Sequence, residues 1–290
     1  GSAGLVASLI AATAKAKVTL IERDRMGGDC LNTGCVPSKA IIRSARVAQT
    51  ARRAQEFGLA PMTVAVNFPQ VMQRVRGIIK TIEPHDSVER FTGLGVNCVS
   101  GDARIVSPWA VEVNGQTLTA RHIIIASGAR PRVPDIPGLA TLDYLTSDTV
   151  WELDQLPQQL LVLGAGPIGC ELAQAFAELG SRVTLVTHAD RILPREDREV
   201  ADLVRAALQR LQVTIHENFE PQRVGKDGSD GYAEFSSSGG DHTVSFSHLL
   251  LAVGRSANTE QMGLEELGIA VGRSGTIEVD DYLCTRMPTI

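Results

Sequence analysis

The sequence predicts an α/β fold made of two similar units, each with a strand, a glycine-rich turn, a helix and a second strand. Residues 159–188, "QLLVLGAGPIGCELAQAFAELGSRVTLVTH", contain this unit complete. The opening residues predict a helix over 2–15 and a strand over 17–22, which is the same order without a first strand. Two further matching segments, "HIIIASG" (122–128) and "HLLLAVG" (248–254), predict an apolar strand that ends at a glycine in each half.

The elements between these segments follow from breakers and periodicity. Residues 37–57 start with a proline and carry apolar residues at helical spacing, so we expect a helix. Residues 68–91 predict a second helical segment that Pro84 kinks or breaks. Residues 95–126 predict short strands, with a hairpin turn at Asn114-Gly115 and with "HIIIA" buried on both faces as a strand of a parallel sheet.

Length and charge restrict the class of protein. A chain of 290 residues, 43% hydrophobic and 21% charged, is long enough for two domains, and the proline-rich residues 129–139 predict a boundary between them. The formal net charge of −5 provides no general attraction for phosphates, so no nucleic-acid partner is expected. No apolar run reaches the roughly 20 residues that span a bilayer, and no signal peptide is evident, so we expect a cytoplasmic protein. Both ends of the sequence look cut.

The "GAGPIG" turn predicts a dinucleotide site because it lies between a strand and a helix. Gly164 allows the tight turn, Gly166 lets a pyrophosphate approach the backbone, and Gly169 lets the helix and strand pack closely. The N-terminus of the helix adds free N–H groups and a partial positive charge. The alternative is a glycine-rich turn without a ligand.

The opening "GSAG" matches the last four positions of the same motif. Glu22 ends the following strand, 18 residues after Gly4, where a carboxylate can accept hydrogen bonds from a ribose diol. "GSAG" alone is a weak signal, since a "GS" can also come from an expression tag. The acid at this spacing favours a second dinucleotide site at Gly1 to Gly4.

The second unit has no acid at the matching strand end, which is Val186-Thr187-His188. An acid there would repel a 2′-phosphate, whereas cationic groups favour NADP(H). His188, Arg191 and Arg195 lie nearby and favour NADPH. The alternative is that these are solvated surface residues.

Two of the five cysteines, Cys30 and Cys35, lie five positions apart. In a regular helix this spacing means about 7.5 Å of rise and about 140° of rotation, so the Cα atoms lie roughly 8 to 9 Å apart. A disulfide needs less than about 7 Å between Cα atoms, so the pair can bond only if the chain between them leaves regular helix. Gly34 and Asn32 tolerate the backbone angles that this requires.

The cysteine pair has three possible interpretations. A structural disulfide fits a cytoplasmic protein poorly. Zinc fits poorly too, because Cys98, Cys170 and Cys284 are scattered and the six histidines do not cluster. A catalytic dithiol remains, and the helix start at Pro37 together with Lys39 would provide the positive surroundings that favour a thiolate. No metal site is predicted.

Four motifs in this order, "GGDCLNTGCVPSK", "ASGARP", "GAGPIGCELAQAF" and "AVGRSANT", resemble the class I flavoprotein pyridine nucleotide–disulfide oxidoreductases. This family includes dihydrolipoyl dehydrogenase and mercuric reductase, and the resemblance covers essentially all of the chain. It implies two Rossmann-like dinucleotide-binding domains. Residues 1–150 would bind FAD and carry the redox disulfide, without the first strand and resuming at 276–290, and residues 151–275 would bind NAD(P).

The resemblance also implies roles for individual residues. Cys35 would face the flavin as the charge-transfer thiolate, Cys30 would exchange with the substrate, and Lys39 would lie near the flavin N5, paired with Glu171. The FAD site would be formed by Gly1, Gly4, Glu22, Gly28 and Gly128. The NAD(P)H site would be formed by Gly164, Gly166, Gly169 and Gly254.

The implied function is an FAD-dependent NAD(P)H dithiol–disulfide oxidoreductase, dihydrolipoyl dehydrogenase-like or mercuric reductase-like, with a small-molecule or metal-ion electron acceptor. The alternative is a flavin- and nucleotide-binding redox sensor or assembly module without turnover. Ala257 stands where the family has proline and Cys284 where it has arginine. The C-terminal dimerisation domain is absent from this sequence, so we expect a homodimer only for the full-length protein and no turnover from the fragment alone.

Overall fold

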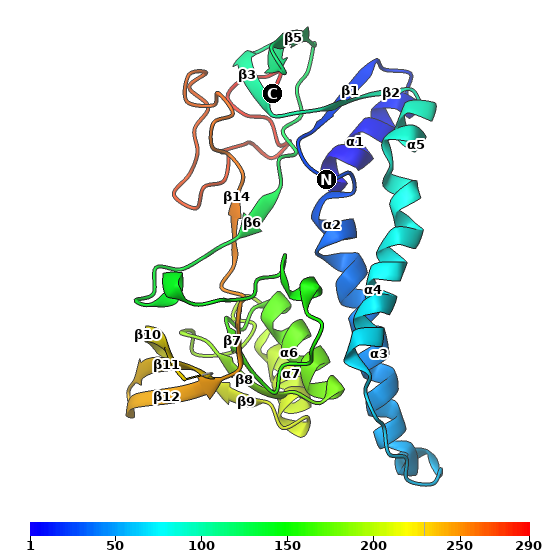
Figure 1. Cartoon of the computed structure of the whole chain (residues 1–290). Helices are drawn as coiled ribbons and strands as arrows, with labels where there is room; N and C mark the ends of the chain where they lie inside the picture. The colour runs from blue at the N-terminus through cyan, green and yellow to red at the C-terminus, as the bar shows by residue number, and fades with distance from the viewer. Residues whose placement is uncertain (229) are drawn as a thin grey trace. The chain divides into compact units, whose positions relative to one another are not determined.

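The computed structural model describes residues 1–228 and 230–290, and the chain forms two compact units (Figure 1). The first unit comprises Gly1–Cys35, Ile79–Arg130 and Arg255–Ile290, and the second comprises Val36–Ile78 and Pro131–Gly254. The mixed α/β fold predicted from the sequence is confirmed. The domain boundaries predicted at residues 150 and 275 stay a prediction.

The first unit begins with the helix and strand expected from the opening residues. Helix α1 (Ser2–Thr13) leads into β1 (Val18–Glu22), which pairs in parallel with β2 (Val96–Ser100). Leu5 of α1 packs with Phe91 and Val96, so burial of an apolar cluster fixes the helix against this two-stranded sheet.

A three-stranded antiparallel meander follows, and it contains the expected hairpin. The strands are β3 (Ala103–Ser107), β4 (Ala110–Val113) and β5 (Gln116–Thr119). Asn114 and Gly115 have φ values of 52° and 74°, and positive φ at both central residues is the signature of a type I′ hairpin turn. The predicted turn is therefore confirmed.

The predicted strand "HIIIA" is wrong for this structure. No strand is formed over residues 122–126, and the Ile124 side chain is 69% exposed. Ile123 donates one backbone hydrogen bond, to Thr289 O at 2.8 Å. A strand needs a continuous ladder with a neighbour, and the apolar side chains alone do not supply one.

Two short strands, β6 (Ala129–Pro131) and β14 (Arg255–Ala257), pair with each other directly after the two strand-end glycines, Gly128 and Gly254. Asn258 continues the pairing, because its N–H donates to Gly128 O at 3.0 Å.

Pro84 breaks the second helical segment, as predicted. Helix α4 (Phe68–Ile82) ends just before it, and a single 3₁₀ turn, η2 (Glu83–Asp86), leads to α5 (Val88–Gly93). Ser87 caps α5 by accepting a hydrogen bond from the Arg90 N–H at 3.2 Å, so the new helix has its own start signal.

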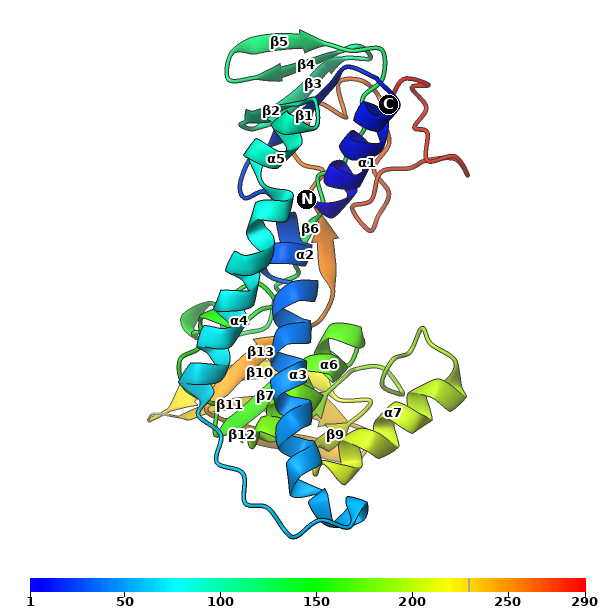
Figure 2. The same ribbon diagram turned by 90° about the vertical axis from the view of Figure 1, so that its right-hand side faces the viewer.

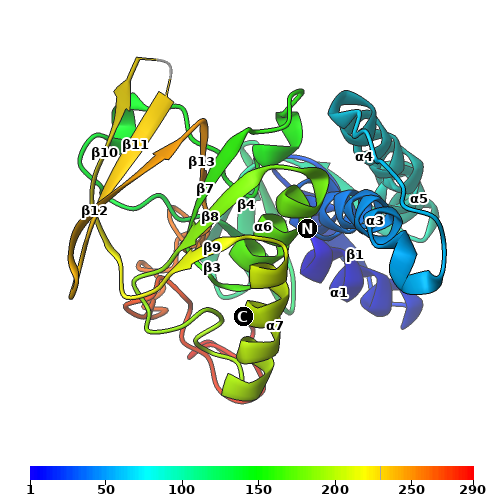
Figure 3. The ribbon, with the colours of Figure 1, turned by 90° about the horizontal axis from the view of Figure 1, so that it is seen from below.

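The centre of the second unit is a four-stranded parallel sheet in the order β13-β7-β8-β9 (Figure 3). Its strands are β7 (Gln159–Leu163), β8 (Arg182–Val186), β9 (Thr214–His216) and β13 (His248–Leu251). Helix α6 (Pro167–Leu179) joins β7 to β8, and α7 (Arg198–Arg210) joins β8 to β9. This strand–turn–helix–strand order is the unit that the sequence predicted for residues 159–188.

A hairpin-rich antiparallel sheet packs on this parallel sheet. It contains β10 (Glu220–Asp227), β11 (Asp230–Ser237) and β12 (Gly240–Phe246). Phe235 of β11 is fully buried with Leu161 of β7 and Leu249 of β13 in one apolar cluster. Short 3₁₀ turns, η3 (Leu139–Thr141) and η4 (Val150–Glu152), lie in the connector before β7.

Helix α3 (Cys35–Arg52) starts two residues before the predicted Pro37 and ends five before Phe57, where a 3₁₀ turn, η1 (Ala54–Phe57), takes over. Helices α3 and α4 run side by side (Figures 1 and 2), and Arg74 of α4 donates to Ala40 O of α3 at 2.8 Å. Phe68 of α4 lies with its ring centroid 6.1 Å from that of Phe176 in α6.

Candidate functional site

The two cysteines of the predicted redox pair lie on different helices. Helix α2 (Gly28–Asn32) carries Cys30 and ends at Thr33, which has φ −137° and ψ 0°, and α3 begins at Cys35. A Cβ added to Gly34 would lie 2.9 Å from Asp29 O, so only glycine allows this close reversal. The chain therefore leaves regular helix between the cysteines, as the disulfide geometry requires.

Both cysteines are thiols in the structure, Cys30 half-buried and Cys35 exposed. Burial raises the pKa of Cys30, and the hydrogen bond and charge of the neighbouring Cys35 sulfur raise it further. The hydroxyl of Ser2 opposes this change, and the Asp86 carboxylate adds to it. Cys35 is the first residue of the 18-residue helix α3.

The glycines and the acid predicted for FAD all lie in the first unit. The Gly1 nitrogen donates to Glu22 Oε2 at 2.8 Å, and a Cβ on Gly28 would lie 2.3 Å from Gly1 Cα. A Cβ on Gly4 would lie 3.3 Å from the Leu20 side chain. Gly128 has φ 70°, and an added Cβ would meet nothing within 4 Å, which leaves its backbone open to a ligand.

Glu22 is held as a hydrogen-bond acceptor. Its Oε1 accepts a hydrogen bond from the Asp24 N–H at 3.1 Å. A carboxylate in this position is suited to accept hydrogen bonds from ribose hydroxyls as well. These residues fit the adenosine end of a dinucleotide.

The three glycines of the "GAGPIG" turn have different steric roles. A Cβ on Gly164, which has φ 102°, would lie 2.4 Å from Ala252 O, and one on Gly169 would lie 1.9 Å from Gly164 O. At Gly166 an added Cβ would meet nothing within 4 Å. Gly164 and Gly169 are thus required by packing, whereas Gly166 leaves space above the N-terminus of α6. Gly254, with φ 112°, is similarly open.

The three residues near the end of β8 that were predicted to favour NADPH differ in their availability to a ligand. Arg191 Nη2 donates to the carbonyls of Pro194 and Glu196 at 3.0 and 3.1 Å, so this guanidinium is engaged within the loop that carries it. His188 and Arg195 are exposed. Two of these three side chains therefore face solvent.

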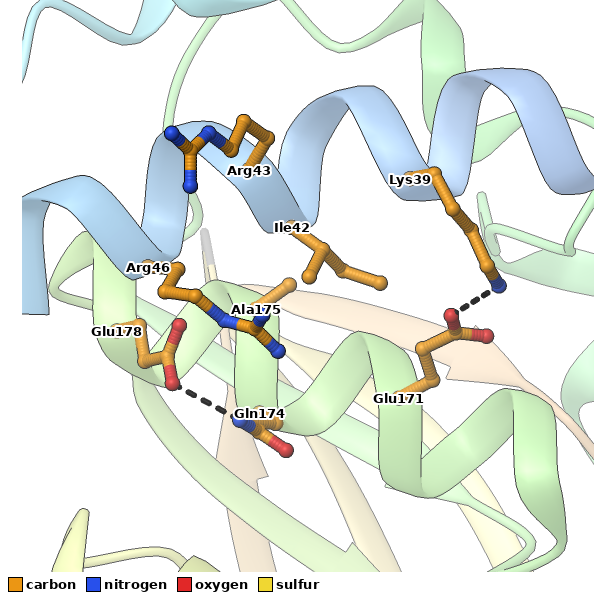
Figure 4. Close-up of a pocket in the computed structure, with 8 residues that line it drawn as sticks. All are labelled: Lys39, Ile42, Arg43, Arg46, Glu171, Gln174, Ala175 and Glu178. Carbon is orange, nitrogen blue, oxygen red and sulfur yellow. Dashed lines mark hydrogen bonds and ion pairs between the residues drawn. The ribbon is translucent and has the colours of Figure 1, made fainter.

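Lys39 and Glu171 face each other across α3 and α6 in the second unit (Figure 4). Lys39 Nζ lies 2.5 Å from Glu171 Oε1, and the two side chains are 66% and 33% exposed. The pair lies in a cleft that is also lined by Arg43, Arg46 and Glu178. Glu178 accepts a hydrogen bond from Gln174 at 2.9 Å. An ion pair this exposed contributes about 0 to 1 kcal/mol to stability, so its chemistry matters more than its energy.

Sequence reasoning missed a second ion pair, beside the cysteines. Arg255 Nη2 is paired with Asp29 Oδ2 and also donates to Ala129 O at 2.5 Å. Asp29 directly precedes Cys30, and 226 positions separate it from Arg255. No local pattern connects residues so far apart, so the pair could be found only in the fold.

The described residues contain neither a membrane-spanning helix nor a group of three metal-ligating side chains. Within 1–228 and 230–290, no helix is long and apolar enough to cross a membrane. No group of three histidine, cysteine, aspartate or glutamate side chains in the same residues could hold a metal ion.

The fold and these arrangements define an α/β protein with two glycine-rich turns and a cysteine pair. The chain belongs to the pyridine nucleotide-disulphide oxidoreductase family, whose model matches residues 1–290. It is 38% identical to a mercuric reductase of Streptomyces lividans over 99% of the chain and 62% of the relative. It is 34% identical to a dihydrolipoyl dehydrogenase of Bacillus subtilis over 99% of the chain and 63% of the relative.

Solved structures agree with this assignment. LpdA from Mycobacterium tuberculosis matches with a TM-score of 0.85 and 30% identity over 97% of this chain and 62% of that one. The HOCl-induced flavoprotein disulfide reductase RclA from Escherichia coli matches with a TM-score of 0.84 and 29% identity over 100% of this chain and 62% of that one. The chain spans between about half and two thirds of the length of such relatives, for example 52% of a Staphylococcus aureus mercuric reductase.

Proposed function

We propose that the full-length protein is an FAD-dependent NAD(P)H dithiol–disulfide oxidoreductase in which Cys30 and Cys35 form the redox-active pair. The observation that carries the proposal is the break between α2 and α3, which brings Cys30 to Cys35 while placing Cys35 at a helix N-terminus.

The residues of the two glycine turns fit the two dinucleotides. Gly1, Gly4, Glu22, Gly28 and Gly128 would hold FAD, and Gly164, Gly166, Gly169 and Gly254 would hold NAD(P)H. FAD, when bound, supplies the coupling between hydride chemistry at a nicotinamide and electron-pair chemistry at sulfur. The chain's own residues then orient the dinucleotides and carry out the sulfur exchange.

The sulfur exchange assigns different work to the two cysteines. With a disulfide acceptor, the Cys30 thiolate attacks one acceptor sulfur, forms a mixed disulfide and releases the other as a thiol after protonation. Cys35 then attacks the Cys30 sulfur, which releases the second acceptor thiol and leaves the Cys30–Cys35 disulfide. The acceptor gains two electrons and two protons, and the dithiol loses them.

Lys39 and Glu171 would support this chemistry as an ion pair next to the flavin. Neutralisation by Glu171 keeps the Lys39 ammonium in one position, where it can stabilise negative charge on a bound cofactor.

The acceptor is a small disulfide or a metal ion. Relatives include mercuric reductases and dihydrolipoyl dehydrogenases, and RclA has been solved as a Cu(II) complex. We favour NADPH over NADH because the strand end at His188 lacks an acid and Arg195 is exposed. The full-length protein is proposed to be a cytoplasmic homodimer, in keeping with its family.

A steady-state screen tests the proposal. Full-length protein loaded with FAD is assayed with NADH and NADPH against lipoamide, glutathione disulfide and Hg(II), and Cys30→Ser is the control. We expect turnover with at least one acceptor and its loss in Cys30→Ser. Rapid reduction by NAD(P)H in stopped flow, without turnover on any acceptor, would instead support a redox sensor.

A further inference from the structure

Helix α2, which carries Cys30, is too short to hold its own position. It has five residues, its N-cap is Gly27 in the left-handed conformation, and no side chain caps it. Isolated helices shorter than about 12 residues are marginal in water, so contacts with the rest of the unit must fix α2.

Three of these contacts act on the apolar side of the helix or within its own loop. Leu31 is 2% exposed and anchors the helix in the core. Asn32 Nδ2 donates to Met26 O at 3.0 Å and to Gly28 O at 2.9 Å, so it stabilises the helix internally. Gly28 packs against Gly1.

The polar side of α2 is held by Arg255. Its Nη2 atom pairs with Asp29 Oδ2 and also donates to Ala129 O at 2.5 Å. The Arg255 side chain is 26% exposed and that of Asp29 is 53% exposed, so the guanidinium is the better shielded partner. Arg255 begins β14 and Ala129 begins β6, so one side chain joins α2 to both strands of the β6-β14 pair.

Each of the three joined residues is the chain neighbour of a predicted site residue. Asp29 precedes Cys30, Ala129 follows Gly128, and Arg255 follows Gly254. From this placement we infer that Arg255 is a positioning residue for the dithiol, which holds Cys30 at the distance from Cys35 that disulfide formation requires. The inference rests on the proposed redox role of that pair.

The geometry predicts a local effect and little change in overall stability. The Asp29 side chain is 53% exposed, so its ion pair with Arg255 contributes little to folding and loss of Arg255 leaves the unit folded. Loss of the contact frees the polar side of α2, which lowers the effective concentration of the Cys30 thiol at Cys35. Lysine is a weak substitute, because its strongly hydrated ammonium on a flexible stem is less pre-organised than the rigid guanidinium of Arg255.

The test is the equilibrium between dithiol and disulfide in the full-length protein. Oxidised and reduced dithiothreitol buffers set the potential, and alkylation followed by mass spectrometry gives the oxidised fraction of Cys30 and Cys35. We expect Arg255→Gln to lower the equilibrium constant for disulfide formation by about threefold to tenfold, equivalent to about 15 to 30 mV. Arg255→Lys should recover only part of this loss.

A double-mutant cycle separates positioning from general damage. If Asp29 and Arg255 act through their contact, Asp29→Ala with Arg255→Gln will lose no more than the larger single change. The matched control is Arg104→Gln, because Arg104 pairs with Glu266 in the same unit at 50% and 60% exposure, away from the cysteines. This variant should keep the wild-type potential.

The outcomes distinguish this inference from the proposed function. A wild-type protein in which Cys30 and Cys35 form no disulfide overturns both. A wild-type disulfide whose potential is unchanged in Arg255→Gln, or changed equally in Arg104→Gln, overturns the positioning role alone. Additive losses in the double variant also overturn it.

Discussion

Replacing either of two glycines in the "GAGPIG" turn by alanine is predicted to damage a different property. The change at Gly169 should lower stability, and the change at Gly166 should weaken NADPH binding. At Gly169 the new methyl would lie 1.9 Å from Gly164 O and 3.4 Å from Ala252 Cβ. Carbon and oxygen atoms in contact are ordinarily more than 3 Å apart, so α6 must move away from the turn. At Gly166 the methyl would meet no protein atom within 4 Å.

The magnitudes follow from these distances. Overpacking costs typically about 1 to 3 kcal/mol, and the obstacle at Gly169 is backbone, which cannot rotate away as a side chain can. Alanine in place of glycine in a helix recovers up to about 1 kcal/mol. We therefore expect Gly169→Ala to lower the free energy of unfolding by about 2 kcal/mol. Gly166→Ala should change it by less than about 0.5 kcal/mol.

Two assays on the full-length protein separate these effects. Urea denaturation measures stability, and isothermal titration calorimetry measures NADPH binding. Gly166→Ala should keep the wild-type denaturation midpoint but weaken NADPH binding at least about tenfold, because the methyl occupies the space a pyrophosphate needs. Unchanged stability in Gly169→Ala, or wild-type NADPH affinity in Gly166→Ala, would refute this assignment of the two glycines.

Three further predictions concern stability. Ser181→Ala should stabilise the protein by up to about 1 kcal/mol in urea denaturation, because the buried Ser181 hydroxyl has no hydrogen-bond partner among the described residues. By contrast, Ser247→Ala should destabilise it by about 1 kcal/mol, because the Ser247 hydroxyl is hydrogen-bonded to the Gln159 backbone. Gly77→Ala, inside α4 with space for a methyl, should raise the free energy of unfolding by about 0.5 to 1 kcal/mol in the same assay. Burial lowers the pKa of His248, so the unfolded chain binds the extra proton first and stability falls as the pH drops below about 6.5. The denaturation midpoints at pH 7.5 and 5.5 should therefore differ less in His248→Gln than in wild type.

The parts of the site that sequence could predict are those set by local sterics. Gly169 is required by its contact with Gly164 in the same turn. The spacing of Cys30 and Cys35 makes a bond between them incompatible with a regular helix whatever the rest of the fold does. Pro84 likewise breaks a helix by its own chemistry.

The parts that sequence could not predict depend on distant partners. "HIIIA" has a strand composition, but strand formation needs a neighbouring backbone, and apart from the Ile123 bond to Thr289 these residues form no ladder. Arg255 and Asp29 meet only because β14 and α2 are brought together by the fold. Neither outcome is encoded in a window of neighbouring residues.

The most direct test of the central claim is to identify which cysteines NAD(P)H reduces. Oxidised full-length protein carrying FAD is mixed anaerobically with one equivalent of NADPH, alkylated and mapped by mass spectrometry. We predict that Cys30 and Cys35 change together from protected to alkylated, while Cys98, Cys170 and Cys284 keep their labelling. Reduction of the protein without new labelling at Cys30 and Cys35, or new labelling at another pair, would contradict the account.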